Sequence, residues 1–172
     1  MNIGSIFMNA FLTRLRHLWL GLRLLPGLLA STQQRQLLAE MRHLCRELPI
    51  ILKQPIPQAM AELEMMGEER PFPLPPEAQT RQLADLAALL DRRSPLGLCL
   101  RRSLLRYRYL HELGMPVTVL FGAKFAPGAA PDKKKVTGHA WLVVGERPYH
   151  EDDANWQGYT VMLRWPKVES GD

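Results

Sequence analysis

The sequence predicts an α+β protein in which the helices come first and an antiparallel sheet follows. Apolar residues recur at helical spacing as far as Leu113, whereas β-branched and alternating apolar segments dominate after Pro116. The chain has 172 residues, of which 47% are hydrophobic and 23% are charged. These proportions are typical of one globular domain with room for a helical preface. They exclude global disorder, collagen-like structure and two full enzymatic domains.

The helical pattern begins near the N-terminus. Over residues 9–29, apolar residues lie at helical spacing with arginines on the other side, which predicts a basic amphipathic helix. Residues 31–48 predict a second amphipathic helix, capped by Ser31 or Thr32. A short helix is predicted over 58–66. The prolines that are expected to hold the chain extended around it are Pro49, Pro55 and Pro57.

A proline-rich run at residues 67–76 is the best internal boundary of the chain. It divides a helical, proline-interrupted segment, 1–76, from a core, 77–166, which is followed by a tail, 167–172. The sequence has no internal repeat, so this division rests on composition alone.

The core is predicted to begin with two helices. The first covers residues 77–91. The pair Ser94-Pro95 is expected to start the second, with Ser as N-cap and Pro at the first helical position, where its missing N–H has no cost. This helix is expected to run to Leu113 and to stop at Gly114.

Strands follow the second of these helices. Residues 117–121 are apolar and β-branched, residues 139–144 alternate, and residues 159–165 form a last strand. A turn over 145–148 is expected to lead from the second of these into a partner strand that begins at Tyr149.

The net charge of +5 is concentrated partly in the first helix, because residues 1–30 carry arginines and no acidic residue. Such a helix can lie on an anionic membrane surface, dock a partner or cover the domain's own core. No apolar run reaches the ~18–20 residues of a membrane span, and Arg23 interrupts what would be a signal peptide. We therefore expect a cytoplasmic protein with peripheral membrane contact through residues 9–29 as one option. No nucleic-acid-binding module is recognisable.

The two cysteines have unlike surroundings, and neither belongs to a CxxC motif or a Cys/His cluster, so no disulfide scaffold and no metal site is expected. Cys45 lies in the apolar stripe of its helix and is predicted to be a small buried hydrophobe. Cys99 lies in the first turn of its predicted helix, where unpaired N–H groups favour a thiolate, and Arg101 and Arg102 add positive charge. These residues alone leave Cys99 as either a reactive thiol or a core cysteine.

A nucleophilic cysteine needs a base, and the base needs an orienting group. His139 is the candidate base, because it opens a strand and would lie at the rim of the sheet. If the next turn is centred on Glu146-Arg147, Asp152 shares the face that His139 uses and Glu151 points away. A one-residue change in the turn reverses this choice, so Asp152 is preferred and Glu151 stays open.

Three motifs in order carry a resemblance to a known family. They are Cys99-Leu-Arg-Arg-Ser103, Gly114-Met-Pro-Val-Thr-Val-Leu-Phe-Gly122 and Gly138-His-Ala-Trp141. Together they resemble the transglutaminase-like, papain-like cysteine-protease superfamily over about residues 77–165. Within it, they are most similar to the leader peptidases of lasso-peptide biosynthesis, the microcin-processing type known as B2 proteins.

This resemblance implies a Cys-His-Asp triad that cleaves a ribosomally made precursor peptide at the end of its leader. The nucleophile maps to Cys99, the base to His139 and the acid to Asp152. The residues after the His-Ala-Trp motif depart from the family pattern, which keeps Glu151 as the alternative. No metal or cofactor is implied. Because residues 1–76 are helical and not strand-rich, a separate leader-binding protein and a macrolactam cyclase are the implied partners.

Three other functions remain open from the sequence. The same triad serves acyl and amide transferases, so hydrolysis and transfer are not separated. A transglutaminase-like fold can also serve as a non-catalytic scaffold, in which case Cys99 is dispensable. A membrane-surface adaptor built on residues 9–29 is the third.

Overall fold

A computed structural model describes residues 20–66, 71–125 and 136–166 of the chain. Parts of three predicted segments lie outside the described residues: 9–19 of the first amphipathic helix, 67–70 of the proline-rich run, and the tail 167–172. Within the described ranges, no helix is both long and apolar enough to cross a membrane.

Helices form the first part of the fold, as the sequence predicts. Residues 20–30 are helical, and four helices with defined bounds follow: α2 (Thr32–Ile51), α3 (Ile56–Met65), α4 (Glu77–Leu90) and α5 (Leu98–Glu112). Ser31 is the N-cap of α2, and its hydroxyl accepts a hydrogen bond from the Gln34 N–H at 3.3 Å. Ser31 and not Thr32 is therefore the residue that caps this helix.

The prolines around α3 interrupt the helices less than predicted. Pro49 lies inside α2, which continues to Ile51. Pro57 lies in the first turn of α3, so this helix begins at Ile56 and not at residue 58. A proline in the first turn removes no intrahelical hydrogen bond, because the N–H groups there have no helical acceptor. Of the three prolines, Pro55 alone lies in the connection between the helices.

The beginning of α5 differs from the prediction in a way that matters for the site. The N-cap is Gly97, and Ser94 instead forms a local turn in which its hydroxyl accepts a hydrogen bond from the Leu96 N–H at 3.3 Å. The prediction that Ser94 caps this helix is wrong, because the hydroxyl is satisfied within that turn. Cys99 is consequently the second residue of α5, nearer to the helix N-terminus than expected.

A four-stranded antiparallel sheet with the order β3-β2-β1-β4 follows the helices. Its strands are β1 (Val117–Phe125), β2 (Val136–Val144), β3 (Arg147–Pro148) and β4 (Thr160–Trp165), with the short α6 (Asp153–Trp156) before β4. The predicted α+β class, with a helical N-terminal half and an antiparallel sheet, is confirmed. In the sheet, His139 lies opposite Gly122, next to the point where the register between β1 and β4 shifts by one residue.

The connection after β2 is not the hairpin that the sequence predicted. Strand β3 has two residues, and its pairing with β2 leaves Gly145 and Glu146 as the turn. His150 has a φ of +48°, so the chain turns away directly after β3. The predicted strand from Tyr149 and the turn centred on Glu146-Arg147 are both wrong. Strand alternation therefore does not govern where Glu151 and Asp152 lie.

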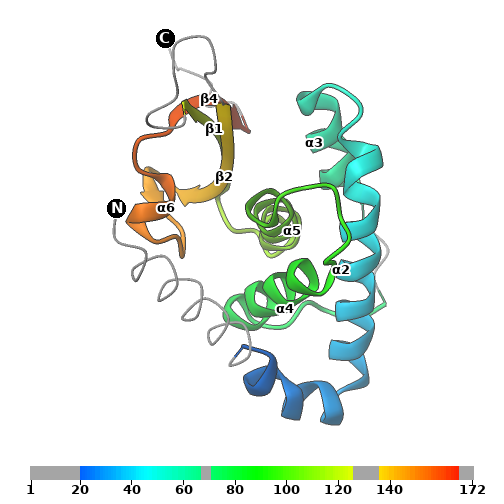
Figure 1. The fold of residues 1–172 in the computed structure, drawn as a ribbon. Helices are drawn as coiled ribbons and strands as arrows, with labels where there is room; N and C mark the ends of the chain where they lie inside the picture. Colours follow the sequence, from blue (N-terminus) through cyan, green and yellow to red (C-terminus); the bar gives the residue numbers. More distant parts are fainter. Residues whose placement is uncertain (1–19, 67–70, 126–135, 167–172) are drawn as a thin grey trace.

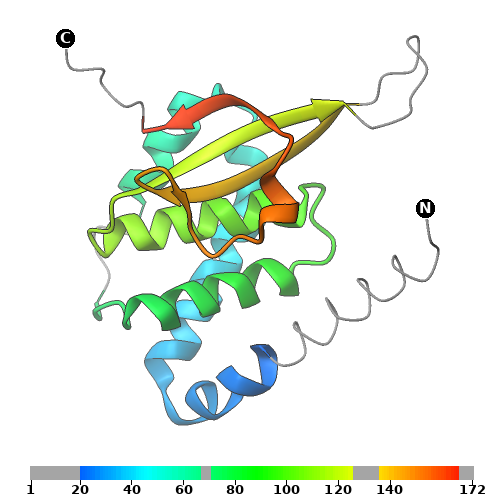
Figure 2. The same ribbon diagram turned by 90° about the vertical axis from the view of Figure 1, so that its left-hand side faces the viewer.

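Helix α5 lies at the centre of the fold. Figure 2 shows α5 between the sheet on one side and α4 on the other, and Figure 1, which looks along α5, shows α2 on the side away from the sheet. One hydrophobic cluster joins buried residues of α2, α3, α4, α5 and the sheet. The boundary predicted at residue 76 stays a prediction, and the helices on either side of it share this core.

Candidate active site

The candidate site begins on one face of α5. Cys99, Arg102, Ser103 and Arg106 occupy positions i, i+3, i+4 and i+7 of the helix, so they share that face. The face is turned toward β2, because the Ser103 hydroxyl donates a hydrogen bond to the Ala140 carbonyl at 2.9 Å in the protein interior. This bond fixes the position of α5 along β2. Its donor, Ser103, lies one helical turn after Cys99, and its acceptor, Ala140, lies one residue after His139.

The Cys99 sulfur lies among hydrogen-bond donors. Burial raises the pKa of the Cys99 thiol, but hydrogen bonds with the His139 side chain and with the backbone N–H groups of Ala140 and Leu100 lower it further than burial raises it. The net pKa of Cys99 is therefore below that of an ordinary thiol. The Leu100 N–H contributes because Cys99 lies in the first turn of α5, where backbone N–H groups have no helical acceptor.

His139 lies in β2 with its ring packed against two aromatic residues, which also contact each other. The centroid of its imidazole is 5.7 Å from that of Trp141 and 5.2 Å from that of Tyr159. Only 11% of the His139 side chain is exposed. Burial lowers the pKa of His139, but the Cys99 thiol and the Glu151 carboxylate favour the imidazolium more strongly and raise this pKa to about 9. Cys99 and His139 thus each favour the charged form of the other.

Glu151 supplies the carboxylate at the imidazole. Its Oε1 lies 3.7 Å from Nε2 of His139, and its Oε2 lies 2.6 Å from Nη2 of Arg102. The Asn155 amide also donates to Oε1 at 2.9 Å. Burial raises the pKa of Glu151, whose side chain is 2% exposed, and its contacts with His139, Arg102 and Asn155 lower that pKa below its usual range.

Asp152, the carboxylate preferred from strand alternation, has a different position. It is exposed and is the N-cap residue of α6. The structure thus places Glu151, and not the preferred Asp152, beside the imidazole, because the chain turns at His150 after the two-residue strand β3. Cys99, His139 and Glu151 are the three predicted or alternative site residues that the fold brings together.

Several residues of the site were missed from the sequence. Arg102 was treated as a source of positive charge near Cys99, although its position three residues later places it on the same helix face and toward Glu151. Asn155 and Tyr159 carried no local signal. Gly122 did carry a local signal, because a glycine inside a strand marks a close approach by other groups. A Cβ there would lie 2.8 Å from the Trp141 ring and 3.0 Å from the Tyr159 Cβ. The glycine leaves room for the rings that flank His139.

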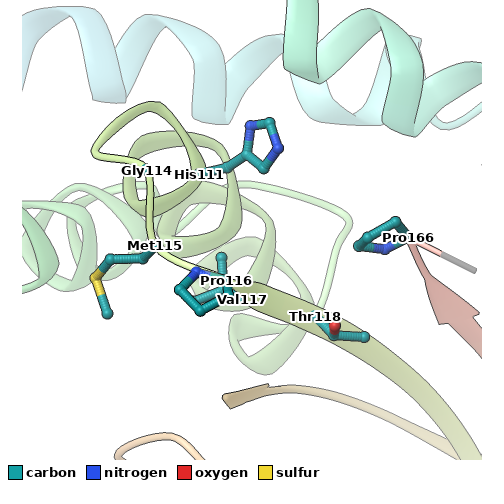
Figure 3. A pocket seen from close by; sticks show the side chains of 7 residues that line it. All are labelled: His111, Gly114, Met115, Pro116, Val117, Thr118 and Pro166. Carbon is teal, nitrogen blue, oxygen red and sulfur yellow. The ribbon is translucent and has the colours of Figure 1, made fainter. Parts of the chain in front are cut away.

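A separate pocket lies at the other end of α5 (Figure 3). Its volume is about 360 Å³, and it is lined by His111, Gly114, Met115, Pro116, Val117, Thr118 and Pro166. None of these lining residues is a cysteine or a carboxylate. The His111 ring stacks on that of Tyr107, with centroids 5.6 Å apart. The pocket therefore lacks the groups of a nucleophile and base.

Among the described residues, no group of three or more Cys, His, Asp and Glu side chains is arranged to hold a metal ion. The site instead offers a thiol with a lowered pKa, an imidazole within hydrogen-bonding reach and a buried carboxylate behind it. This arrangement can activate a sulfur nucleophile and hand a proton to a leaving group.

Comparison with known families agrees with this chemistry. Residues 44–164 match the transglutaminase-like superfamily, and because the match covers more than half of the chain, the protein belongs to that superfamily. Members are typically cysteine proteases or transferases in fold. The match begins within α2, upstream of the residues that carried the resemblance in the sequence. No curated protein and no solved structure matches this chain.

Proposed function

We propose that this protein is a cysteine peptidase that removes the leader from a ribosomally made lasso-peptide precursor, with Cys99 as nucleophile, His139 as base and Glu151 as orienting acid. The observation that carries the chemistry is the meeting of these three side chains at the N-terminus of α5. Each comes from a different part of the chain, and each favours the charged state that catalysis needs.

The proposed reaction has two stages. Because Nε2 of His139 faces Glu151, the other ring nitrogen, Nδ1, takes the thiol proton of Cys99. The thiolate attacks the scissile carbonyl, and the imidazolium then gives its proton to the leaving amine as the C–N bond breaks. A water molecule, deprotonated by His139, attacks the resulting thioester, which releases the carboxylic acid and restores the thiol.

The backbone around Cys99 suits the charged intermediates of this reaction. Unpaired N–H groups in the first turn of α5 are the proposed donors to the oxyanion that forms when sulfur attacks the carbonyl. Glu151 keeps the imidazole in one orientation and offsets the positive charge that it gains. These roles need no metal and no cofactor.

The finer assignment to lasso-peptide maturation is supported by the three sequence motifs from Cys99 to Trp141. We further propose that a separate leader-binding protein presents the precursor and that a macrolactam cyclase acts on the product. Docking of a partner or a membrane surface on the N-terminal helix is supported by three exposed leucines on one of its faces, which are Leu22, Leu25 and Leu29, with 68%, 50% and 72% of their surfaces exposed.

The test is cleavage of a lasso-type precursor peptide from the same genome, followed by mass spectrometry with and without the neighbouring leader-binding protein. We expect one cut at the end of the leader with the wild-type chain and none with Cys99→Ala, while Cys45→Ala cuts normally. Equal cleavage by Cys99→Ala would exclude the peptidase. A maturation pathway that still works with Cys99→Ala in cells would favour the scaffold instead.

Hydrolysis and acyl transfer are separated by the fate of the thioester. In ¹⁸O-labelled water, a peptidase places one label in the new carboxylate of the leader. With added hydroxylamine, a transferase gives mainly the hydroxamate even at low amine concentrations. Exclusive amide or hydroxamate formation would turn the proposal toward transfer while leaving the roles of Cys99 and His139 intact.

A further inference from the structure

We propose that Arg102 is a positioning residue that acts through Glu151, so that α5 supplies both the nucleophile and the cation that fixes the acid behind the base. This inference rests on the proposed function of Cys99 and His139. In this proposal, Arg102 does not contact the reacting atoms, and its effect on them passes through the Glu151 carboxylate.

The geometry joins these groups in a closed ring. From Cys99, contacts lead to His139, from its Nε2 to Oε1 of Glu151 at 3.7 Å, and from Oε2 of Glu151 to Arg102 at 2.6 Å. Arg102 returns to Cys99 along a single turn of α5. The two carboxylate oxygens thus have separate tasks, one toward the imidazole and one toward the guanidinium.

The surroundings leave Glu151 few alternatives to Arg102. Its side chain is 2% exposed, so water cannot readily replace the guanidinium. The remaining partner of Glu151, Asn155, is neutral and bonds the same oxygen that faces His139. Without Arg102, Oε2 would lose its charged partner in a buried position, and the carboxylate would be free to rotate or to take up a proton.

Neighbouring arginines of α5 are used differently. Arg101 donates to the carbonyl oxygens of Ala88 at 2.7 Å and Leu96 at 3.1 Å, which ties α5 to α4 and the connection between them. Arg106 makes a two-pronged ion pair with Asp85 at 2.6 and 2.7 Å. Of these three arginines, Arg102 is the one whose carboxylate partner also faces His139.

The loss of Arg102 has a predictable direction with pH. In the part of the chain that the structure describes, two charged or titratable groups face Glu151, which are Arg102 from α5 and His139 from β2. The neutral Asn155 faces it from α6. His139 in turn faces Cys99. Arg102 helps to lower the pKa of Glu151, so its removal raises that pKa. At mildly acidic pH, Glu151 is then protonated, the imidazolium loses its anion and the thiolate becomes rarer.

The experiment is the pH profile of Cys99 alkylation by iodoacetamide in the full chain, with the labelled cysteine assigned by peptide mass spectrometry. For Arg102→Gln we expect the acid side of the profile to move up by about one pH unit. Arg102→Lys keeps the charge and should restore most of the wild-type profile. Arg93→Gln removes an exposed arginine that precedes α5 and is expected to leave the profile unchanged.

A double variant separates positioning through Glu151 from a general structural role. In a Glu151→Gln background, Arg102→Gln should cause no further shift, because its route to His139 is already gone. A further shift there, or an Arg102→Gln profile that coincides with the wild type, overturns the inference. If Arg102→Gln does not fold, the double variant, which removes both members of the buried pair, is compared with Glu151→Gln. Equal pH profiles of these two variants support the inference, and unequal profiles overturn it.

Failure of the proposed function looks different from failure of this inference. If wild-type Cys99 titrates as an ordinary thiol and His139→Ala does not change it, the nucleophile and base are wrong, and the role of Arg102 falls with them. If the wild-type thiolate persists at low pH and depends on His139 while Arg102→Gln has no effect, only the role of Arg102 is wrong.

Discussion

The two cysteines lie in two regions of the molecule that treat a thiol in opposite ways. Cys45 is in the helical layer, on the buried face of α2, with no exposed surface and its sulfur 3.7 Å from Oδ2 of Asp91. Burial and the Asp91 charge raise the pKa of Cys45 to about 11. Cys99 is at the junction of α5 and β2, where His139 and backbone N–H groups lower its pKa although burial again opposes ionisation.

The comparison shows that burial alone does not decide the state of a thiol here. Cys45 is fully buried and Cys99 partly so, and in both cases burial favours the neutral form of the thiol. The difference lies in the neighbours. Cys45 lies near Asp91, which raises its pKa, as well as Arg101, which lowers it. At Cys99, by contrast, His139 and two backbone N–H groups all lower the pKa. The helical region therefore holds a packing residue, and the helix–sheet junction holds a candidate nucleophile.

The largest expected contrast is between the two thiols in the folded wild-type chain. At pH 7, a pKa of about 11 leaves about one Cys45 thiol in 10⁴ ionised, and that thiol is also inaccessible. We expect iodoacetamide to label Cys99 at least roughly 10³-fold faster, measured by peptide mass spectrometry. Comparable labelling of both cysteines would erase the distinction, and labelling in urea is the control that shows both can react.

Removal of the imidazole should come next in size. His139→Ala is expected to slow Cys99 alkylation at pH 6.5 by roughly 100-fold, because the thiolate loses its cation. His111→Ala, at the other end of the same helix, is the matched control and should leave the rate within twofold. If both variants behave alike, the low pKa of Cys99 comes from the helix N-terminus and not from His139.

The choice of carboxylate is tested by a pair of isosteric variants. Glu151→Gln should lower the rate of peptide cleavage by roughly 10-fold to 100-fold, since the imidazolium loses the anion that orients it. Asp152→Asn, one residue later and exposed, is expected to have little effect. A stronger effect of Asp152→Asn than of Glu151→Gln would restore the assignment made from strand alternation.

The smallest expected difference is in folding stability. Cys45→Ala removes a fully buried sulfur and should lower the free energy of unfolding by about 1–2 kcal/mol. Cys99→Ala should cost less, because it also removes a half-buried group whose charged form is unfavourable to bury. Urea denaturation followed by circular dichroism measures both. A larger loss for Cys99→Ala would indicate that this thiol is the packing residue.

Local patterns in the sequence predicted the class of fold and the order of the longer helices and strands. The helix from Glu77 and the strand ending at Trp165 were expected within one residue of where they lie. The order of the motifs predicted that Cys99 and His139 lie close together. Their contact in the fold depends on the hydrogen bond between Ser103 and Ala140, which no local pattern indicates.

The third group could not be predicted for a physical reason. Strand parity assigns a face only while the strand continues, and β3 ends after two residues. A positive φ at His150, a residue type that adopts this conformation less readily than glycine, then redirects the chain. The partners that hold Glu151 come from α5, which is distant in sequence, and from α6, which is short. Neither therefore leaves a periodic signal near Glu151.

One residue of β2, Ala140, has a consequence for how the site is assembled. Ala140 uses its N–H for the Cys99 sulfur and its carbonyl for the Ser103 hydroxyl, so both polar groups of one residue are held by successive turns of α5. Cys99 and His139 are thereby held together by folding itself. In the proposed peptidase, the binding energy of a substrate then serves to select the peptide and not to assemble these two groups.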